Sequence, residues 1–157
     1  MVNEITSQKI EVGNLPELYE VDDYLWLQKT IDILIARDLD KLDLENLIEE
    51  LKTLGKRNFN KVRSLLRQIL IYLLFLEYWQ QEYDRNHRHW QAEVITFRYD
   101  LVHSLTTTLF NKLNEDLENI YQVAAKLVTK KTNFPANIFP AHCPYSFDKI
   151  LDGSCLP

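Results

Sequence analysis

The sequence predicts an all-α protein, a helical bundle of about five helices with a wrapped C-terminal tail. Apolar residues recur at helical spacing from residue 22 to residue 128. The chain holds three glycines and five prolines, and four of the prolines lie after residue 134. Little in the first 134 residues therefore breaks a helix. The proline-containing tail is rich in large apolar residues, so we expect it to pack on the bundle.

The length of 157 residues suits a single helical domain spanning residues 1–157. Residues 1–14 are polar and unpatterned, and are expected to form a loose N-terminal arm. The N-terminus lacks the apolar segment of a signal peptide. The most apolar run, residues 69–76, is far shorter than the roughly 20 residues that span a bilayer. We therefore expect a cytoplasmic protein with no membrane contact, in which Cys143 and Cys155 are reduced.

The first helix is expected to begin at Asp22, a good N-cap. Its predicted buried stripe consists of Tyr24, Leu27, Ile31, Leu34 and Ile35. Trp26 and Ile33 lie on the other side, a second apolar face that needs a partner. Asp43 is expected to cap a second helix, which Gly55 ends or kinks. The predicted stripe of that helix consists of Leu44, Leu47, Ile48, Leu51 and Leu54.

A third helix is expected to run to about Trp79, with its apolar end near residues 69–76 at the centre of the bundle. Residues 80–88 are polar and are predicted to form a loop. Trp90 and Phe97 begin the stripe of a fourth helix and are expected to anchor the core. Residues 106–108 are threonines that separate it from a last long helix, and Ser146 is expected to cap a short helix in the tail.

The net charge of −5 is unevenly distributed. Residues 1–50 carry 13 acidic and 4 basic side chains, whereas residues 51–100 carry 9 basic and 5 acidic ones. Such a chain can pair its halves internally or associate with itself. A modest basic stripe is formed by Lys52, Lys56, Arg63 and Arg67, which lie within about 60° on an ideal helix. Nucleic-acid binding favours more positive charge and exposed aromatic residues, so we expect no nucleic-acid partner.

Several polar residues have spacings that could suit a metal or a reactive group. Glu45 and Glu49 share a helix face, but the sequence has no Glu-x-x-His to complete a di-metal bundle site. His87 and His89 could chelate a metal from an extended chain. Cys143, beside His142, could be an activated thiol. A solvated helix face, an ordinary histidine-containing loop and a packed cysteine explain these residues more simply, and we expect no cofactor.

Arg98 and His103 match the Arg-x4-His spacing of the higher eukaryote and prokaryote nucleotide-binding ribonucleases. Residues i and i+5, however, lie about 140° apart on a helix. A polar residue is favoured after the arginine in those enzymes, and this chain has Tyr99 there. The alternative structural role of Arg98 is an ion pair at the core edge with an acidic residue of another helix.

Three segments resemble the bacterial family known as domain of unknown function 29. They are residues 19–58, the segment HWQAEVITFRYDL at 89–101, and the ending FPAHCPYSFDKILDGSCLP at 139–157. The resemblance implies a small all-helical domain and no established activity. The long central helix of that family often carries a His and a Lys in its apolar run. This chain has Tyr72 and Phe75 there, so chemistry built on that histidine would be absent.

The sequence thus favours a non-enzymatic interaction or regulatory domain with a protein partner, such as a second copy in a homodimer. The alternative is a small ribonuclease-like enzyme that uses Arg98 and His103.

Overall fold

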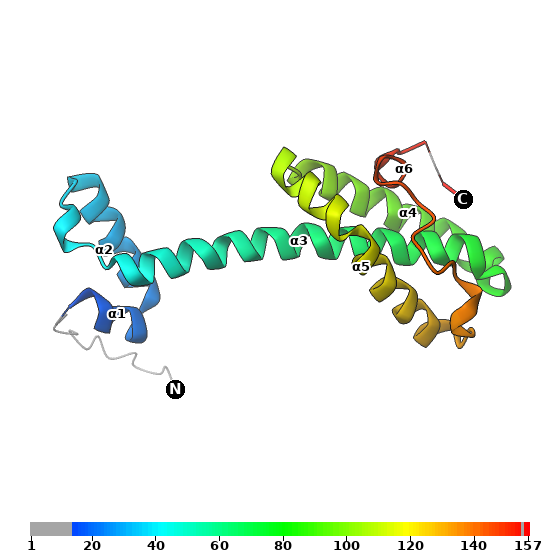
Figure 1. Cartoon of the computed structure of the whole chain (residues 1–157), viewed down its shortest axis with the longest axis horizontal. Coiled ribbons are helices and arrows are strands. Elements are labelled where there is room, and N and C mark those ends of the chain that lie inside the picture. The colour runs from blue at the N-terminus through cyan, green and yellow to red at the C-terminus, as the bar shows by residue number, and fades with distance from the viewer. Residues whose placement is uncertain (1–13, 155) are drawn as a thin grey trace, which may run out of the picture. The chain divides into compact units, whose positions relative to one another are not determined.

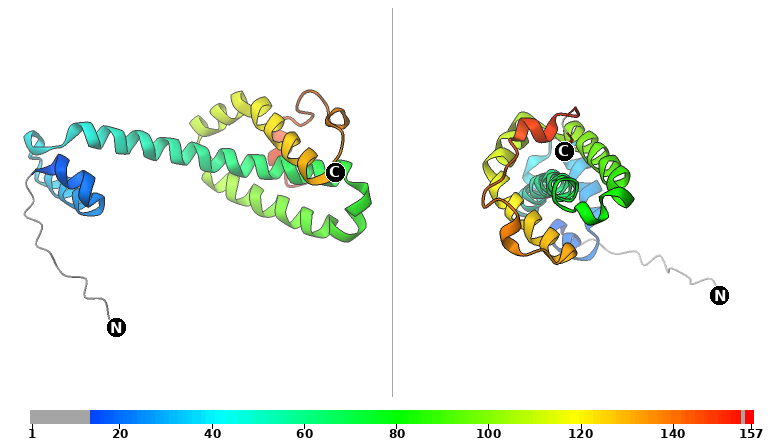
Figure 2. Two further views of the ribbon diagram at one scale, coloured as in Figure 1. Left: turned by 90° about the horizontal axis from the view of Figure 1, so that it is seen from below. Right: turned by 90° about the vertical axis from the view of Figure 1, so that its right-hand side faces the viewer.

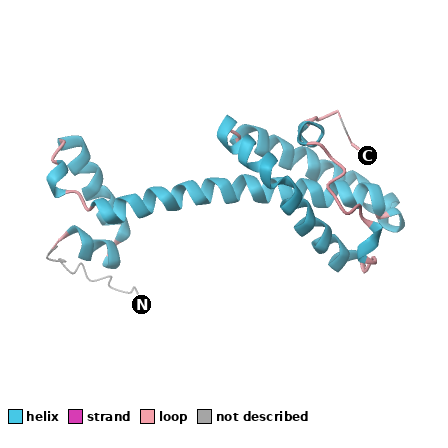
Figure 3. Ribbon diagram, in the orientation of Figure 1, coloured by secondary structure: helices cyan, strands magenta, loops and turns pink. Residues whose placement is uncertain are grey.

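The structure is a computed structural model that describes residues 14–154 and 156–157. These residues form helices and connecting segments, with no strand among them (Figures 1 and 3). The α-helices are α1 (Leu15–Val21), α2 (Asp23–Ala36), α3 (Leu44–Tyr78), α4 (Gln80–Ser104), α5 (Thr107–Thr132) and α6 (Phe147–Leu151). Short 3-10 turns are η1 (Leu39–Lys41) and η2 (Ala136–Ile138). The predicted all-α class is confirmed, and no helix within the described ranges is long and apolar enough to cross a membrane.

The chain divides into two compact units, Met1–Gly55 and Lys56–Pro157. They are called the N-terminal unit and the C-terminal unit below. Helix α3 begins in the first unit and continues into the second. Whether the two units act as the single domain expected from the chain length stays a prediction.

The N-terminal unit contains one helix that the sequence did not predict. Helix α1 begins after Asn14, whose side chain accepts a hydrogen bond from the backbone N–H of Glu17, and Pro16 occupies its first turn. The predicted caps of the next helices are confirmed: Asp22 accepts from the N–H of Leu25, and Asp43 accepts from the N–H of Asn46. Residues 1–13 of the expected N-terminal arm lie outside the described residues.

The prediction that Gly55 ends or kinks a helix is wrong. Helix α3 passes through this position without interruption, and no atom lies within 4 Å of where a Cβ of Gly55 would be. A single glycine inside a helix costs roughly 1 kcal/mol relative to alanine, which the packed second half of a 35-residue helix readily offsets.

The predicted loop at residues 80–88 is also wrong, because these residues form the first turns of α4. Polar and aromatic side chains of this stretch contact one another one helical turn apart. The amide of Asn86 donates to the carboxylate of Glu82 at 2.9 Å, and the ring of His87 stacks on that of Tyr83. Polarity here marks a partly solvent-facing stretch of helix.

In the C-terminal unit, the second half of α3 lies at the centre, between α4 and α5 (Figure 2). Residues 69–76 are all buried except half-buried Tyr72, which confirms the predicted centre of the bundle. Trp90 is 4% exposed and stacks on Trp79 with ring centroids 5.6 Å apart, and Phe97 packs against the same core. Both predicted anchors are confirmed.

The C-terminal tail packs on this bundle through polar contacts with each of its long helices. From α5, the Tyr121 hydroxyl donates to the carbonyl of Pro140 at 2.7 Å. From α3, Glu77 accepts from the hydroxyl of Tyr145, and burial together with this bond raises the pKa of Tyr145. Ser146 caps α6 as predicted, accepting from the N–H of Lys149. The apolar anchors of the tail are Phe139, Phe147 and Ile150.

Candidate interaction surface

The buried side of α2 is the opposite of the predicted one. Trp26 is 1% exposed, whereas the stripe expected to be buried lies at the surface. The indole N–H of Trp26 donates to the carboxylate of Asp43 at 3.1 Å, and its ring meets the Tyr19 ring edge-on at 4.9 Å. Tyr19 belongs to α1, the helix that the sequence did not predict. Periodicity located both faces of α2, but it could not show which face had a neighbour in the chain.

Around Trp26 the N-terminal unit has a very small core. Within residues 14–55, the buried side chains are Leu18, Trp26, Thr30 and Asp43. Polar contacts surround them: Asn46 donates to Asp43 at 2.7 Å, and the hydroxyl of Tyr19 donates to Glu50 at 2.8 Å. That hydrogen bond to Glu50 raises the pKa of Tyr19. Only two of the four buried residues are large and apolar.

Helix α2 exposes an apolar arc to solvent. The residues are Tyr24, Leu27, Ile31, Leu34 and Ile35, between 39% and 76% exposed. On an ideal helix they span roughly 100°, and no charged residue of α2 falls inside that arc.

The first turns of α3 expose a second arc of the same kind. Four of its residues, Leu44, Ile48, Leu51 and Leu54, are 49–59% exposed, and Leu47 between them is half-buried. This arc spans roughly 120° on an ideal helix and contains no charged residue. The stripe predicted for this helix therefore exists, and it lies largely at the surface. We call the two arcs together the apolar face of the N-terminal unit.

Charged residues lie outside both arcs. Residues 14–55 contain eleven acidic and four basic side chains. Glu45 and Glu49, considered above as metal ligands, are exposed residues of α3 beside its arc, and Glu49 lies 3.8 Å from Lys52. Each arc is thus free of charge, and the charged side chains elsewhere in the unit are mostly acidic.

Arg98 lies in the C-terminal unit and is 4% exposed. Its Nε donates to the backbone carbonyl of Ile150 at 2.6 Å, near the C-terminal end of α6. A cation is favourable there because the last carbonyls of a helix carry partial negative charge. Its charge also helps to lower the pKa of Asp152, after the hydrogen bonds from Ser154 to that carboxylate. Arg98 thus joins α4 to α6 through the Ile150 carbonyl, and the ion pair expected from the sequence stays a prediction.

The structure does not bring His103 to Arg98. The His103 ring is exposed, lies 4.0 Å from the Tyr99 ring and contacts the Tyr99 carbonyl through Nδ1 at 2.8 Å. The helical geometry of residues 98 and 103 keeps the two side chains on different sides of α4.

His87 and His89 also lie on α4, so the extended chain that alternate-residue chelation requires is not present there. The Nδ1 atom of His87 contacts the Tyr83 carbonyl at 2.9 Å, and that of His89 lies 3.9 Å from Glu93. In the part of the chain that the structure describes, no three His, Cys, Asp or Glu residues are placed to hold a metal ion.

Cys143 is a half-buried residue of the tail whose backbone N–H donates to Glu118 at 3.0 Å. Burial raises the pKa of its thiol, which is the opposite of what an activated nucleophile requires. The neighbouring His142 is exposed and lies 3.5 Å from Glu118. Cys155 lies outside the described residues, so the expectation that both thiols are reduced stays a prediction.

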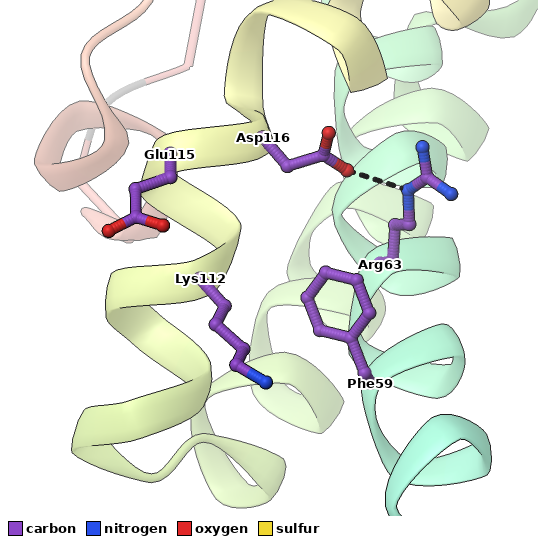
Figure 4. A pocket seen from close by; sticks show the side chains of 5 residues that line it. All are labelled: Phe59, Arg63, Lys112, Glu115 and Asp116. Atoms are coloured by element: carbon purple, nitrogen blue, oxygen red, sulfur yellow. Dashed lines mark ion pairs between the residues drawn. The ribbon is translucent and has the colours of Figure 1, made fainter.

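An open pocket of about 440 Å³ lies on the C-terminal unit, between α3 and α5 (Figure 4). It is lined by Phe59, Arg63, Lys112, Glu115 and Asp116. Arg63 Nε lies 2.8 Å from Asp116 Oδ2, so one member of the predicted basic stripe is already paired. The remaining charged residues, Lys112 and Glu115, are of opposite sign, so the pocket favours neither an anion nor a cation.

A family model described as domain of unknown function DUF29 matches residues 18–156. The chain belongs to this family. A crystal structure of an α-helical protein of unknown function from Rhodospirillum rubrum has the same fold, with a TM-score of 0.60 and 23% sequence identity over 85% of this chain and 89% of that one. No curated protein matches the chain. The predicted family and its helical fold are confirmed, and neither comparison attaches an activity to the DUF29 domain.

Proposed function

We propose that this DUF29 chain is an interaction domain that binds a protein surface through the apolar face of its N-terminal unit. The observation that supports this most directly is the imbalance between the core of that unit and its surface. Leu18 and Trp26 are its two large buried apolar residues among those described, while nine large apolar residues of the face are 39–76% exposed.

Units of this size are difficult to stabilise alone. Below roughly 70–80 residues, a single hydrophobic core rarely supplies more than about 3–5 kcal/mol, and small folded units often add a disulfide, a metal or association with another chain. The described part of the N-terminal unit has 42 residues and contains no cysteine. Contiguous apolar patches beyond a few hundred Å² on a protein surface typically mark interaction sites. Burial of the apolar face by a partner would supply the stabilisation that the small core lacks.

The test is the size of the complex that the protein forms in native cell lysate. Ile31→Glu/Leu51→Glu places one carboxylate in each arc. Lys29→Gln/Lys52→Gln is the matched control, because it changes the net charge equally at positions outside the arcs. In size-exclusion chromatography, the wild type and the control should elute in a complex and the face variant as a monomer. Co-elution of the face variant with the wild type would overturn the proposal.

A further inference from the structure

The spacing of residues within the apolar face identifies the surface that fits it. In α2, Tyr24, Leu27, Ile31 and Leu34 follow one another at intervals of three, four and three residues. In α3, Leu44, Leu47, Leu51 and Leu54 repeat the same intervals. This alternation is the a/d pattern of helices that pack side by side in coiled coils and four-helix bundles. Each arc therefore fits another helix that carries a seam of the same period.

We propose that the apolar face binds a second copy of this chain, so that α2 and the start of α3 from two copies form a four-helix assembly. This inference rests on the proposed function and names its partner. A second copy supplies two seams of the required spacing. A two-fold symmetric interface also needs a patch that is complementary to itself, and two uncharged apolar arcs can meet without burying a charge.

The area of the face agrees with the needs of a stable dimer. Burial of a fully exposed aliphatic side chain removes roughly 60–120 Å² of apolar surface, the area that corresponds to its usual transfer free energy. Nine side chains about half exposed therefore offer roughly 400 Å² per copy. A standard interface buries roughly 800 Å² per partner, of which somewhat more than half, or about 450 Å², is apolar.

The acidic excess of the N-terminal unit predicts how this dimer responds to salt. Two N-terminal units, each with eleven acidic and four basic residues between positions 14 and 55, repel one another at low ionic strength. Added salt screens that repulsion, so the dimer should tighten as ionic strength rises. A foreign partner with a basic surface would respond in the opposite direction.

The experiment is sedimentation equilibrium of the purified full-length chain over a range of concentrations and ionic strengths. We expect a species of twice 18.7 kDa, with an affinity that increases with salt. A symmetric interface contains each substitution twice, so Ile31→Glu and Leu51→Glu should each raise the dissociation constant at least about a hundredfold. Lys29→Gln/Lys52→Gln, which removes positive charge outside the arcs, should still dimerise.

Two features keep the test decisive if a face variant folds poorly. Dimerisation makes the melting temperature of the wild type rise with protein concentration, and that measurement needs no variant. A purified wild type that stays monomeric would overturn the second copy as partner, and a lysate complex lost only in the face variant would then still support the interaction domain. A dimer that either Glu substitution leaves intact would overturn the four-helix assembly.

Discussion

Removal of the Trp26 side chain should unfold the N-terminal unit locally. Trp26 joins the three helices of that unit: it lies on α2, its ring meets Tyr19 of α1, and its indole N–H donates to Asp43 at the start of α3. Its side chain is 1% exposed. Truncation of a buried tryptophan to alanine costs about 3–5 kcal/mol. Leu18, the other large buried apolar residue described in this unit, contributes only about 1.5–3 kcal/mol by burial.

A more conservative substitution separates the ring contact from the hydrogen bond. Trp26→Phe keeps an aromatic ring against Tyr19 but loses the N–H donor to Asp43. A hydrogen bond to a charged group contributes about 1.5–3 kcal/mol. The loss should lie near the lower end of that range, because Asn46 continues to donate to Asp43 at 2.7 Å.

Hydrogen exchange followed by mass spectrometry measures both effects segment by segment. In Trp26→Ala, amides of α1 and α2 should lose most of their protection, while those of residues 69–76 in the core of the C-terminal unit should keep theirs. Trp26→Phe should give a smaller loss in the same segments. Gln28→Ala, at an exposed position of α2, is the control and should change nothing. Wild-type protection of α1 and α2 in Trp26→Ala would refute the assignment of Trp26 as the centre of this unit.

Three further predictions concern the C-terminal unit. Trp90→Ala should lower the free energy of unfolding in a denaturant titration by about 3–5 kcal/mol, because the ring is 4% exposed and stacked on the core. A decrease of less than about 1 kcal/mol would show that the Trp90 ring lies at the surface. Arg98→Ala should lower the free energy of unfolding by at least about 1 kcal/mol in the same assay, because its hydrogen bond to Ile150 is lost, whereas His103→Ala should change it very little. If both variants stayed stable and both lost an RNA-cleaving activity of the wild type, the ribonuclease alternative would be favoured instead. The pKa of the Glu118 carboxyl is lowered from 4.5, chiefly by the hydrogen bond from the Cys143 N–H. The ionised carboxylate therefore stabilises the fold above pH 4.5, and this stabilisation is lost as the pH falls through the lower pKa of the folded state. Glu118→Gln should flatten the acid side of a plot of melting temperature against pH, and an unchanged acid side would contradict this role of Glu118.

Several features could be predicted from sequence because they depend on local chemistry. The helices capped by Asp22, Asp43 and Ser146 begin where the sequence predicts them. The apolar second half of α3 could only be stable at the centre of a bundle, and it is buried there. The sequence predicted two interruptions that the structure does not contain, at Gly55 and at residues 80–88. Local composition is similar in an exposed stretch of helix and in a loop, so it could not distinguish the two.

The sequence by itself determined that this protein is helical, where most helices begin, and which residues form each apolar stripe. Only the tertiary structure decided which stripe the chain buries. Tyr24 and Trp26 lie on different faces of α2, and hydrophobic periodicity favoured the face of Tyr24, which carries more apolar residues. Trp26 is buried because Tyr19 and Asp43 meet it from other helices, and such contacts depend on distant parts of the chain. No such neighbours cover the stripe that includes Tyr24 in the described residues, so it stays exposed at the surface of the N-terminal unit.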